Sequence, residues 1–294
     1  MMRKILCFGW LLLLPALVLA DTHGHPVTLW KADGAGNTVY LLGSVHLLRR
    51  EDHPLPAVID AAYDDAETLF MELDMDDLDP LAMQATVNRL GMLDEGQSLR
   101  DVMGEDLYEE ALRAAESLDI PLDMLARTEP WYAAITIEQL ALTRIGFNPL
   151  WGIEMHMMSR ASEDGKEIHG FESVEQQLGF LDALSLDVQR ELLLQTLADG
   201  ANLRDIMDQL VTAWRTGDIA YMEETLLAEI ADYPELYEAI VADRNRNWVN
   251  TIDKLLRDEE DYLVIVGALH LIGEDGMPQL LEARGYKVSQ MHEQ

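Results

Sequence analysis

Two short segments near opposite ends of the chain carry the same pattern, and this pattern constrains the fold more than any other feature. Each is an apolar run followed at once by Gly-x-x-His-Leu, ending at His46-Leu47 in one case and at His270-Leu271 in the other. The two apolar runs, 38–43 and 262–267, have the length and composition of buried strands. Because such strands are buried only inside a sheet, we expect both ends of the chain to meet in one sheet.

Four further segments have the pattern of strands. The run 27–31 is separated from 38–43 by a turn rich in Gly and Asn, which predicts a β-hairpin. The other three strands are predicted at 68–73, 166–171 and 285–288. The chain is 49% hydrophobic, so a sizeable core is expected.

Helical spacing of apolar residues dominates the rest of the chain. A short helix is predicted near 54–65, a large helical insertion at about 80–164, and a second helical segment at about 184–257. Strands come first, helices in the middle, and a strand, a helix and a strand last. This order predicts an α/β fold in a single domain, 21–294, with a central, mostly parallel sheet flanked by helices.

The N-terminus has the features of a cleaved secretory signal. Arg3 and Lys4 precede an apolar run that ends at Ala20, and this run is short for a membrane span. We therefore predict a signal peptide at 1–20, a periplasmic or secreted protein, and no stable membrane insertion after cleavage. The single cysteine, Cys7, lies in this segment, so disulfides, cysteine nucleophiles and cysteine-bound zinc are excluded from the mature chain.

The chain is strongly acidic, with a formal net charge of −33. DNA and RNA would be repelled from most of such a surface, so nucleic acid is excluded as a partner. The charge favours a cationic or metal-bearing partner instead. The helices between Leu184 and Arg257 offer a surface for a homodimer.

Four side chains follow or end the predicted strands. His46 and His270 come after glycines that allow a sharp turn or a close approach. Glu72 lies at the end of the strand 68–73, and Glu172 directly follows the strand 166–171. Ligands in open parallel sheets bind beyond the carboxyl ends of the strands. If these strands run parallel, the four side chains gather at one edge of the sheet.

Two imidazoles and two carboxylates form a suitable ligand set for a divalent metal ion such as Mn²⁺, Co²⁺, Zn²⁺ or Fe²⁺. Such an ion lowers the pKa of its bound water and polarises a carbonyl, while Glu72 or Glu172 acts as the base, so hydrolysis is the expected reaction. The alternative for each histidine alone is a hydrogen-bonded loop residue without a ligand.

Arg244 stands out because the chain has few cations. Near the strand ends that carry the predicted metal site, its guanidinium could stabilise an oxyanion or bind a carboxylate of the substrate. The family resemblance described below favours this catalytic role for Arg244. The alternative is an ion pair at the surface.

These motifs together resemble the TraB/GumN family, which is related to the Tiki metalloproteases and the pheromone-shutdown proteins. The resemblance runs from about Val27 to Val288. It is carried by the two Gly-x-x-His motifs and by four further segments: Gly152-Ile153-Glu154, Gly170-Phe171-Glu172-Ser173 with Gln176, Asp243-Arg244-Asn245, and Gly267–Val288.

The resemblance implies a fold of the erythromycin-esterase and haem-binding-lipoprotein type. For the Tiki branch it implies metal-dependent proteolysis that uses two histidines and an acidic residue, which match His46, His270 and Glu72. It implies a peptide or protein substrate. The rival hypothesis is a protein without catalysis that sequesters a peptide, haem or a metal ion in the same crevice.

Overall fold

The computed structural model describes residues 24–200 and 202–293, which form a six-stranded sheet with helices on both faces. The predicted signal peptide, 1–20, lies outside the described residues. The strands have the order β4-β3-β5-β2-β1-β6 across the sheet. Their bounds are β1 Pro26–Asp33, β2 Thr38–Ser44, β3 Thr68–Leu73, β4 Ile168–Glu172, β5 Tyr262–Gly267 and β6 Lys287–His292.

The four strands that carry the predicted site residues run parallel to one another. β5 lies between β2 and β3, and β4 pairs with β3 at the edge. β1 and β2 form the predicted antiparallel hairpin, and β6 pairs antiparallel to β1. The α/β class and the mostly parallel sheet are therefore confirmed, and the two ends of the chain meet in its centre.

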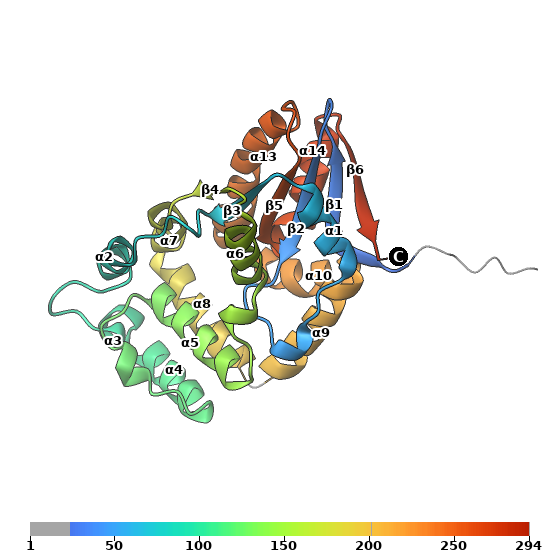
Figure 1. The fold of residues 1–294 in the computed structure, drawn as a ribbon. Helices are drawn as coiled ribbons and strands as arrows, with labels where there is room; N and C mark the ends of the chain where they lie inside the picture. The colour runs from blue at the N-terminus through green and yellow to red at the C-terminus, as the bar shows by residue number, and fades with distance from the viewer. Residues whose placement is uncertain (1–23, 201, 294) are drawn as a thin grey trace, which may run out of the picture.

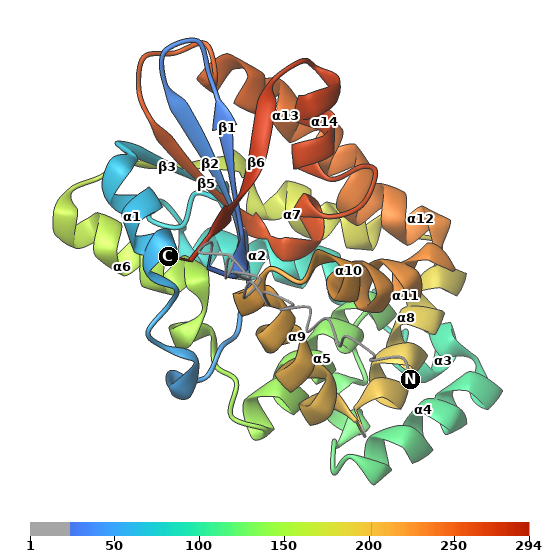
Figure 2. The same ribbon diagram turned by 90° about the vertical axis from the view of Figure 1, so that its right-hand side faces the viewer.

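Alternation along β5 explains why helices cover both faces of the sheet. Leu263 and Ile265 point to one face and pack with α1, α6 and α9, whereas Val264 and Val266 point to the other and pack with α13 and α14. Figure 2 shows the sheet between these two groups of helices. The helices have the bounds α1 Ala57–Asp65, α6 Ile153–Asp164, α9 Leu203–Thr216, α13 Asp243–Leu255 and α14 Met277–Ala283.

A group of helices between β3 and β4 projects from the carboxyl ends of the strands (Figure 1). They are α2 Pro80–Leu90, α3 Leu99–Met103, α4 Glu105–Ser117 and α5 Pro130–Arg144, followed by α6. Apolar side chains of α3, α4 and α5 form a separate core with α8 (Leu186–Asp199). This small core supports the structure that lies beyond the strand ends.

The segment between β4 and α13 begins with α7 (Val174–Asp182) and α8, and α9 follows. It then continues through short helices and two π-helical turns: α10 Ile219–Met222, η4 Glu223–Leu227, α11 Ala228–Ala231, α12 Pro234–Tyr237 and η5 Glu238–Ala242. The remaining short elements are 3₁₀ turns: η1 Arg50–Asp52, η2 Leu122–Leu125, η3 Pro149–Trp151 and η6 Ala268–Leu271. Within residues 24–200 and 202–293, no helix has both the length and the apolar character needed to cross a membrane.

Four strands differ in extent from the sequence prediction. β1 covers 26–33 rather than 27–31, and β2 ends at Ser44 rather than at residue 43. β4 begins at Ile168 rather than 166, because the backbone N–H of Lys166 still caps α6 and its side chain donates to the carbonyls of Tyr63 and Ala66. β6 covers 287–292 rather than 285–288. Gly285 has φ of 92° where the chain leaves α14, and pairing with β1 then continues to His292.

A substitution at Gly43 tests the close packing at the end of β2. A Cβ at this position would lie 2.5 Å from Thr28 Cγ2 and 3.1 Å from Ala268 Cα, whereas a Cβ on Gly36 would meet nothing within 4 Å. We expect Gly43→Ala to lower the free energy of unfolding by about 1–3 kcal/mol in urea denaturation, because the neighbouring backbone must move. Gly36→Ala is the control, and equal effects of the two would contradict this packing.

Candidate functional site

The carboxyl ends of the four parallel strands bring the predicted residues to one edge of the sheet. His46 lies two residues beyond β2, Glu72 lies near the end of β3, and Glu172 is the last residue of β4. His270 lies in η6, directly after β5. Arg244, in the first turn of α13, reaches the same edge from the helical layer.

Arg244 joins the two carboxylates. Its Nη2 donates to Glu72 Oε2 at 2.5 Å and to Glu172 Oε1, and its Nε donates to Glu172 Oε2 at 3.4 Å. The guanidinium also lies 4.5 Å from the ring centroid of Trp248, and Arg244 is only 7% exposed. A buried cation of this kind is stable only with its partners, so it is no surface ion pair.

Glu72 is held in the ionised state. Its Oε1 accepts the backbone N–H of Gly267 at 2.8 Å, and its Oε2 accepts a bond from Gln177 at 2.9 Å besides that of Arg244. Burial alone would raise the pKa of Glu72, but the neighbouring His270, Arg244 and His46 and the Gly267 N–H outweigh it and lower the pKa to about 2.

Asn245 determines the tautomer of His270. Its Nδ2 donates to the carbonyls of His270 and Asp275 at 3.1 and 2.8 Å, so its Oδ1 is left as an acceptor. His270 Nδ1–H therefore donates to Asn245 Oδ1 at 2.7 Å, and the lone pair of Nε2 accepts a bond from Arg244 Nη1 at 3.2 Å. Burial lowers the pKa of His270 to about 3, so the ring is neutral at pH 7.

Unlike His270, His46 is exposed to solvent and paired with a carboxylate. Its Nδ1 lies 2.7 Å from Glu154 Oε1, and the hydroxyl of Ser44 donates to the same oxygen. The charge of Glu154 is the main cause that raises the pKa of His46 to about 10. This bond to Nδ1 turns Nε2 toward the other site residues.

Gly267 lies at the centre of the arrangement. A Cβ built on it would lie 3.3 Å from Glu72 Oε1, 3.6 Å from His46 Nε2 and 3.7 Å from His270 Cδ2, so the three side chains surround one point. Beside them is a cavity of about 290 Å³, lined by His46, Met71, Glu72, Leu73, Met75, Pro149, Glu154, Met155 and Gln177. The absence of a side chain at Gly267 keeps this point open.

The residues that surround Gly267 have donors suited to a metal ion. Glu72 Oε1 and His270 Nε2 are both acceptors and lie 3.8 Å apart. Two ligands each about 2.1 Å from one ion are at most about 4.2 Å apart, so this pair fits a shared cation. As the side chains stand, no group of three or more His, Cys, Asp or Glu among the described residues is arranged to hold a metal ion.

Glu172 differs from Glu72 in both contacts and protonation. It is bonded to Arg244, and the structure gives it no hydrogen bond to His46 or His270. Burial raises the pKa of Glu172, and the charge of Glu72 adds to this effect, whereas Arg244 opposes it. Two neighbouring carboxylates with pKa values shifted in opposite directions can take different roles in acid–base chemistry.

Sequence reasoning missed the residues that orient the two histidines. Asn245 adjoins Arg244 in the Asp-Arg-Asn segment, but nothing in the pattern shows that its amide faces an imidazole 25 positions later. Glu154 belongs to the Gly152-Ile153-Glu154 segment, and in the structure its carboxylate on α6 is bonded to His46, just beyond β2. The only signals in the sequence are that both belong to motifs of the resembled family.

Comparison with known proteins agrees with these motifs. The sequence profile described as the TraB/PrgY/gumN family matches residues 28–290. The uncharacterized protein YbaP of Escherichia coli is 24% identical over 243 residues, covering 82% of this chain and 87% of YbaP. An uncharacterized protein of Treponema pallidum is 23% identical, covering 87% of this chain and 80% of its own length.

One relative has a named activity. Metalloprotease TIKI2 of Xenopus tropicalis is 22% identical over 302 aligned positions, which cover 85% of this chain and 57% of TIKI2. No solved structure matches the chain at a significant level. The expected likeness to the erythromycin-esterase and haem-binding-lipoprotein type therefore stays a prediction.

Two arginines near the start of α13 offer a matched test of the buried ion pairs. Arg244→Met would leave Glu72 and Glu172 buried without a cation, and we expect a loss of about 3–5 kcal/mol in the free energy of unfolding. Arg246 is 46% exposed and pairs with Glu238 and Asp243, so Arg246→Met should cost less than about 1 kcal/mol. Similar losses in chemical denaturation would contradict the assigned environment of Arg244.

The low pKa of His270 predicts an acid-dependent loss of stability. The unfolded chain takes up a proton at this histidine below about pH 6.5, whereas the folded chain does so only near pH 3. Stability is therefore lost as the pH falls through this window. In His270→Gln, the slope of the unfolding free energy between pH 6 and 4 should become shallower by about 1 kcal/mol per pH unit.

His46→Gln is the control for that measurement, because its shift has the opposite sign. Folded His46 keeps its proton above the pH at which the unfolded chain loses it, so its contribution disappears as the pH rises above about 6.5. This variant should change the slope above pH 7, where His270→Gln should leave it unchanged. An unchanged acid slope in His270→Gln would show that His270 is protonated in the folded protein.

Proposed function

The chain belongs to the TraB/PrgY/gumN family, and we propose that it is a divalent-metal-dependent hydrolase that cleaves peptide bonds at the edge formed by His46, Glu72, Glu172 and His270. One observation carries this proposal. Glu72 Oε1 and His270 Nε2 lie 3.8 Å apart beside an open cavity, and His270 Nε2 accepts a bond from Arg244 Nη1 at 3.2 Å, so a cationic group already lies at this pair. A divalent ion between this carboxylate and this neutral imidazole would take the place of the Arg244 bond at Nε2.

The metal ion would be held by His46, Glu72 and His270. Asn245 and Glu154 support this assignment, because each accepts a bond at the Nδ1 of a histidine and so directs its Nε2 to the site. His270 Nε2 would exchange its bond from Arg244 for the ion, and His46 Nε2 would first lose its proton. A bound Mn²⁺, Co²⁺, Zn²⁺ or Fe²⁺ would lower the pKa of a water and polarise a carbonyl. Glu172 would act as a further ligand only after its carboxylate breaks its hydrogen bonds to Arg244.

The chain's own residues supply the rest of the chemistry. Glu172, whose pKa is raised, is suited to take a proton from the attacking water at its carboxylate and to pass it on. Glu72 stays ionised throughout. Arg244 holds the two carboxylates in place and presents its positive charge to the developing oxyanion or to a carboxylate of the substrate.

The cellular setting is part of the proposal and rests on the sequence. The segment 1–20 has the features of a signal peptide, so we propose a periplasmic or secreted enzyme that acts on a peptide or a protein. The relative TIKI2, named a metalloprotease, supports both the reaction type and the need for a metal ion.

The test is metal-dependent cleavage. The purified protein is stripped with a chelator, reloaded with Mn²⁺, Co²⁺, Zn²⁺ or Fe²⁺, and incubated with a random peptide library that is read by mass spectrometry. We expect cleavage only with metal, and a loss of at least about 100-fold in Glu72→Gln and in His270→Ala. Elemental analysis should show reduced metal in His46→Ala and His270→Ala.

His292→Ala, at the exposed end of β6, is the matched control and should retain both metal and activity. Full metal content and full cleavage in both His46→Ala and His270→Ala would exclude the proposed site. Bound metal or bound peptide without cleavage under any metal would instead support the rival, a sequestering protein.

A further inference from the structure

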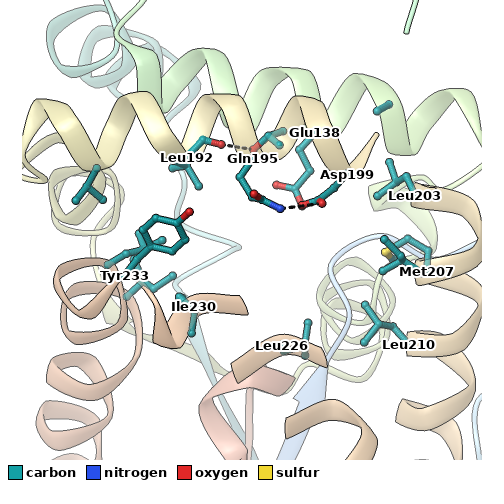
Figure 3. Close-up of a pocket in the computed structure, with 16 residues that line it drawn as sticks. Glu138, Leu192, Gln195, Asp199, Leu203, Met207, Leu210, Leu226, Ile230 and Tyr233 are labelled. Carbon is teal, nitrogen blue, oxygen red and sulfur yellow. Dashed lines mark hydrogen bonds between the residues drawn. The ribbon is translucent and has the colours of Figure 1, made fainter. Parts of the chain in front are cut away.

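A second, larger cavity lies among the helices beyond the strand ends. It measures about 330 Å³ and is bounded by α5 and α8 on one side, α9 on another, and the segment from η4 to η5 on the third. Figure 3 shows side chains from all three sides pointing into this space. We call it the helical groove. Its volume is in the range of sites that bind small ligands or parts of peptides.

The lining of the helical groove is mostly aliphatic. Representative side chains are Leu192 from α8, Met207 and Leu210 from α9, Leu226 from η4 and Ile230 from α11. Apolar surface that lines an open groove gains free energy when an apolar side chain displaces its water. The occupant must therefore offer aliphatic surface.

Two carboxylates interrupt this apolar lining at one place. Glu138 from α5 and Asp199 from α8 lie side by side and face the groove, and Gln195 donates to Asp199 at 2.9 Å (Figure 3). Burial raises the pKa of Glu138, and the charge of Asp199 adds to this effect. A cation placed between the two carboxylates would relieve their mutual repulsion.

The wall of the helical groove is hydrogen-bonded to residues at the candidate active site. The charge of His46 lowers the pKa of Glu138, against the effects of burial and of Asp199. Ile240 lines the groove, and its carbonyl accepts a bond from Arg244 Nη1 at 3.2 Å. Glu223, the first residue of η4, accepts the N–H of Gly273 at 2.9 Å just beyond η6. The groove wall and the catalytic residues are therefore parts of one framework.

We propose that the helical groove binds the substrate peptide next to the bond that is cleaved, and that it selects a segment in which aliphatic side chains adjoin a lysine or an arginine. This inference rests on the proposed peptidase function. The aliphatic side chains fill the space between α8, α9 and η4, and the cationic side chain lies between Glu138 and Asp199. The net charge of −33 favours the approach of such a segment.

The test measures binding without cleavage. Metal-free protein is titrated into fluorescein-labelled peptides, and fluorescence anisotropy gives the dissociation constant for the sequences Ser-Leu-Leu-Lys-Ser, Ser-Leu-Leu-Glu-Ser and Ser-Ser-Ser-Lys-Ser. We expect the first peptide to bind at least about tenfold more tightly than each of the others. The preference for lysine over glutamate should fall as ionic strength rises.

Variants that remove charges show whether the peptide binds in the helical groove. Glu138→Gln/Asp199→Asn should weaken binding of the Leu-Leu-Lys peptide about tenfold and leave the Leu-Leu-Glu peptide no weaker. The matched control, Glu110→Gln/Glu191→Gln, removes the same charge from exposed positions that do not line the groove, on α4 and α8. Far-UV circular dichroism checks that both double variants are folded.

The outcomes separate this inference from the proposed function. Selective binding that is lost in the groove variant and kept in the control supports the groove, whether or not any peptide is cleaved. Equal binding of the three peptides, or equal loss in the two double variants, overturns the groove even if the protein is an active peptidase. Absence of cleavage under every metal overturns the hydrolase alone.

Discussion

The burial of Arg244 between two carboxylates is the interaction on which the rest of the site depends. Its guanidinium joins Glu72 on β3, Glu172 on β4 and the carbonyl of Ile240 in η5, which are far apart in the sequence. Its Nη1 also lies 3.2 Å from His270 Nε2. Removing a charge from water is costly, and here these four partners together offset the cost. Correct assembly of the strand ends and ionisation of Glu72 therefore depend on each other.

The two histidines show how tertiary contacts give identical motifs different properties. His270 is buried and donates to a neutral amide, so it stays uncharged and its Nε2 accepts a bond from Arg244. His46 is exposed and bonded to Glu154, so its charged form is favoured. One histidine near Gly267 is neutral and the other is readily charged, so the charge of the site depends on the ion or substrate that enters.

The π-helical turns link the candidate site to the helical groove. A π-helical turn adds a residue within a helix and redirects the side chains that follow, and such turns are frequent at functional sites. η5 places Ile240 in the helical groove and its carbonyl on Arg244. The same element thus contributes to the position of the catalytic residues and to the surface that a substrate would meet.

The sequence alone determined which segments become strands, which residues end them, and that Gly-x-x-His follows two of them, because strand periodicity and glycine placement are local properties. It also determined the family. The tertiary structure decided that Arg244 occupies the space between Glu72 and Glu172, that Asn245 and Glu154 orient the histidines, and that a groove forms between α8 and η4. These contacts join residues 25 to 172 positions apart, and their hydrogen bonds and charges have no periodic pattern that a sequence could reveal.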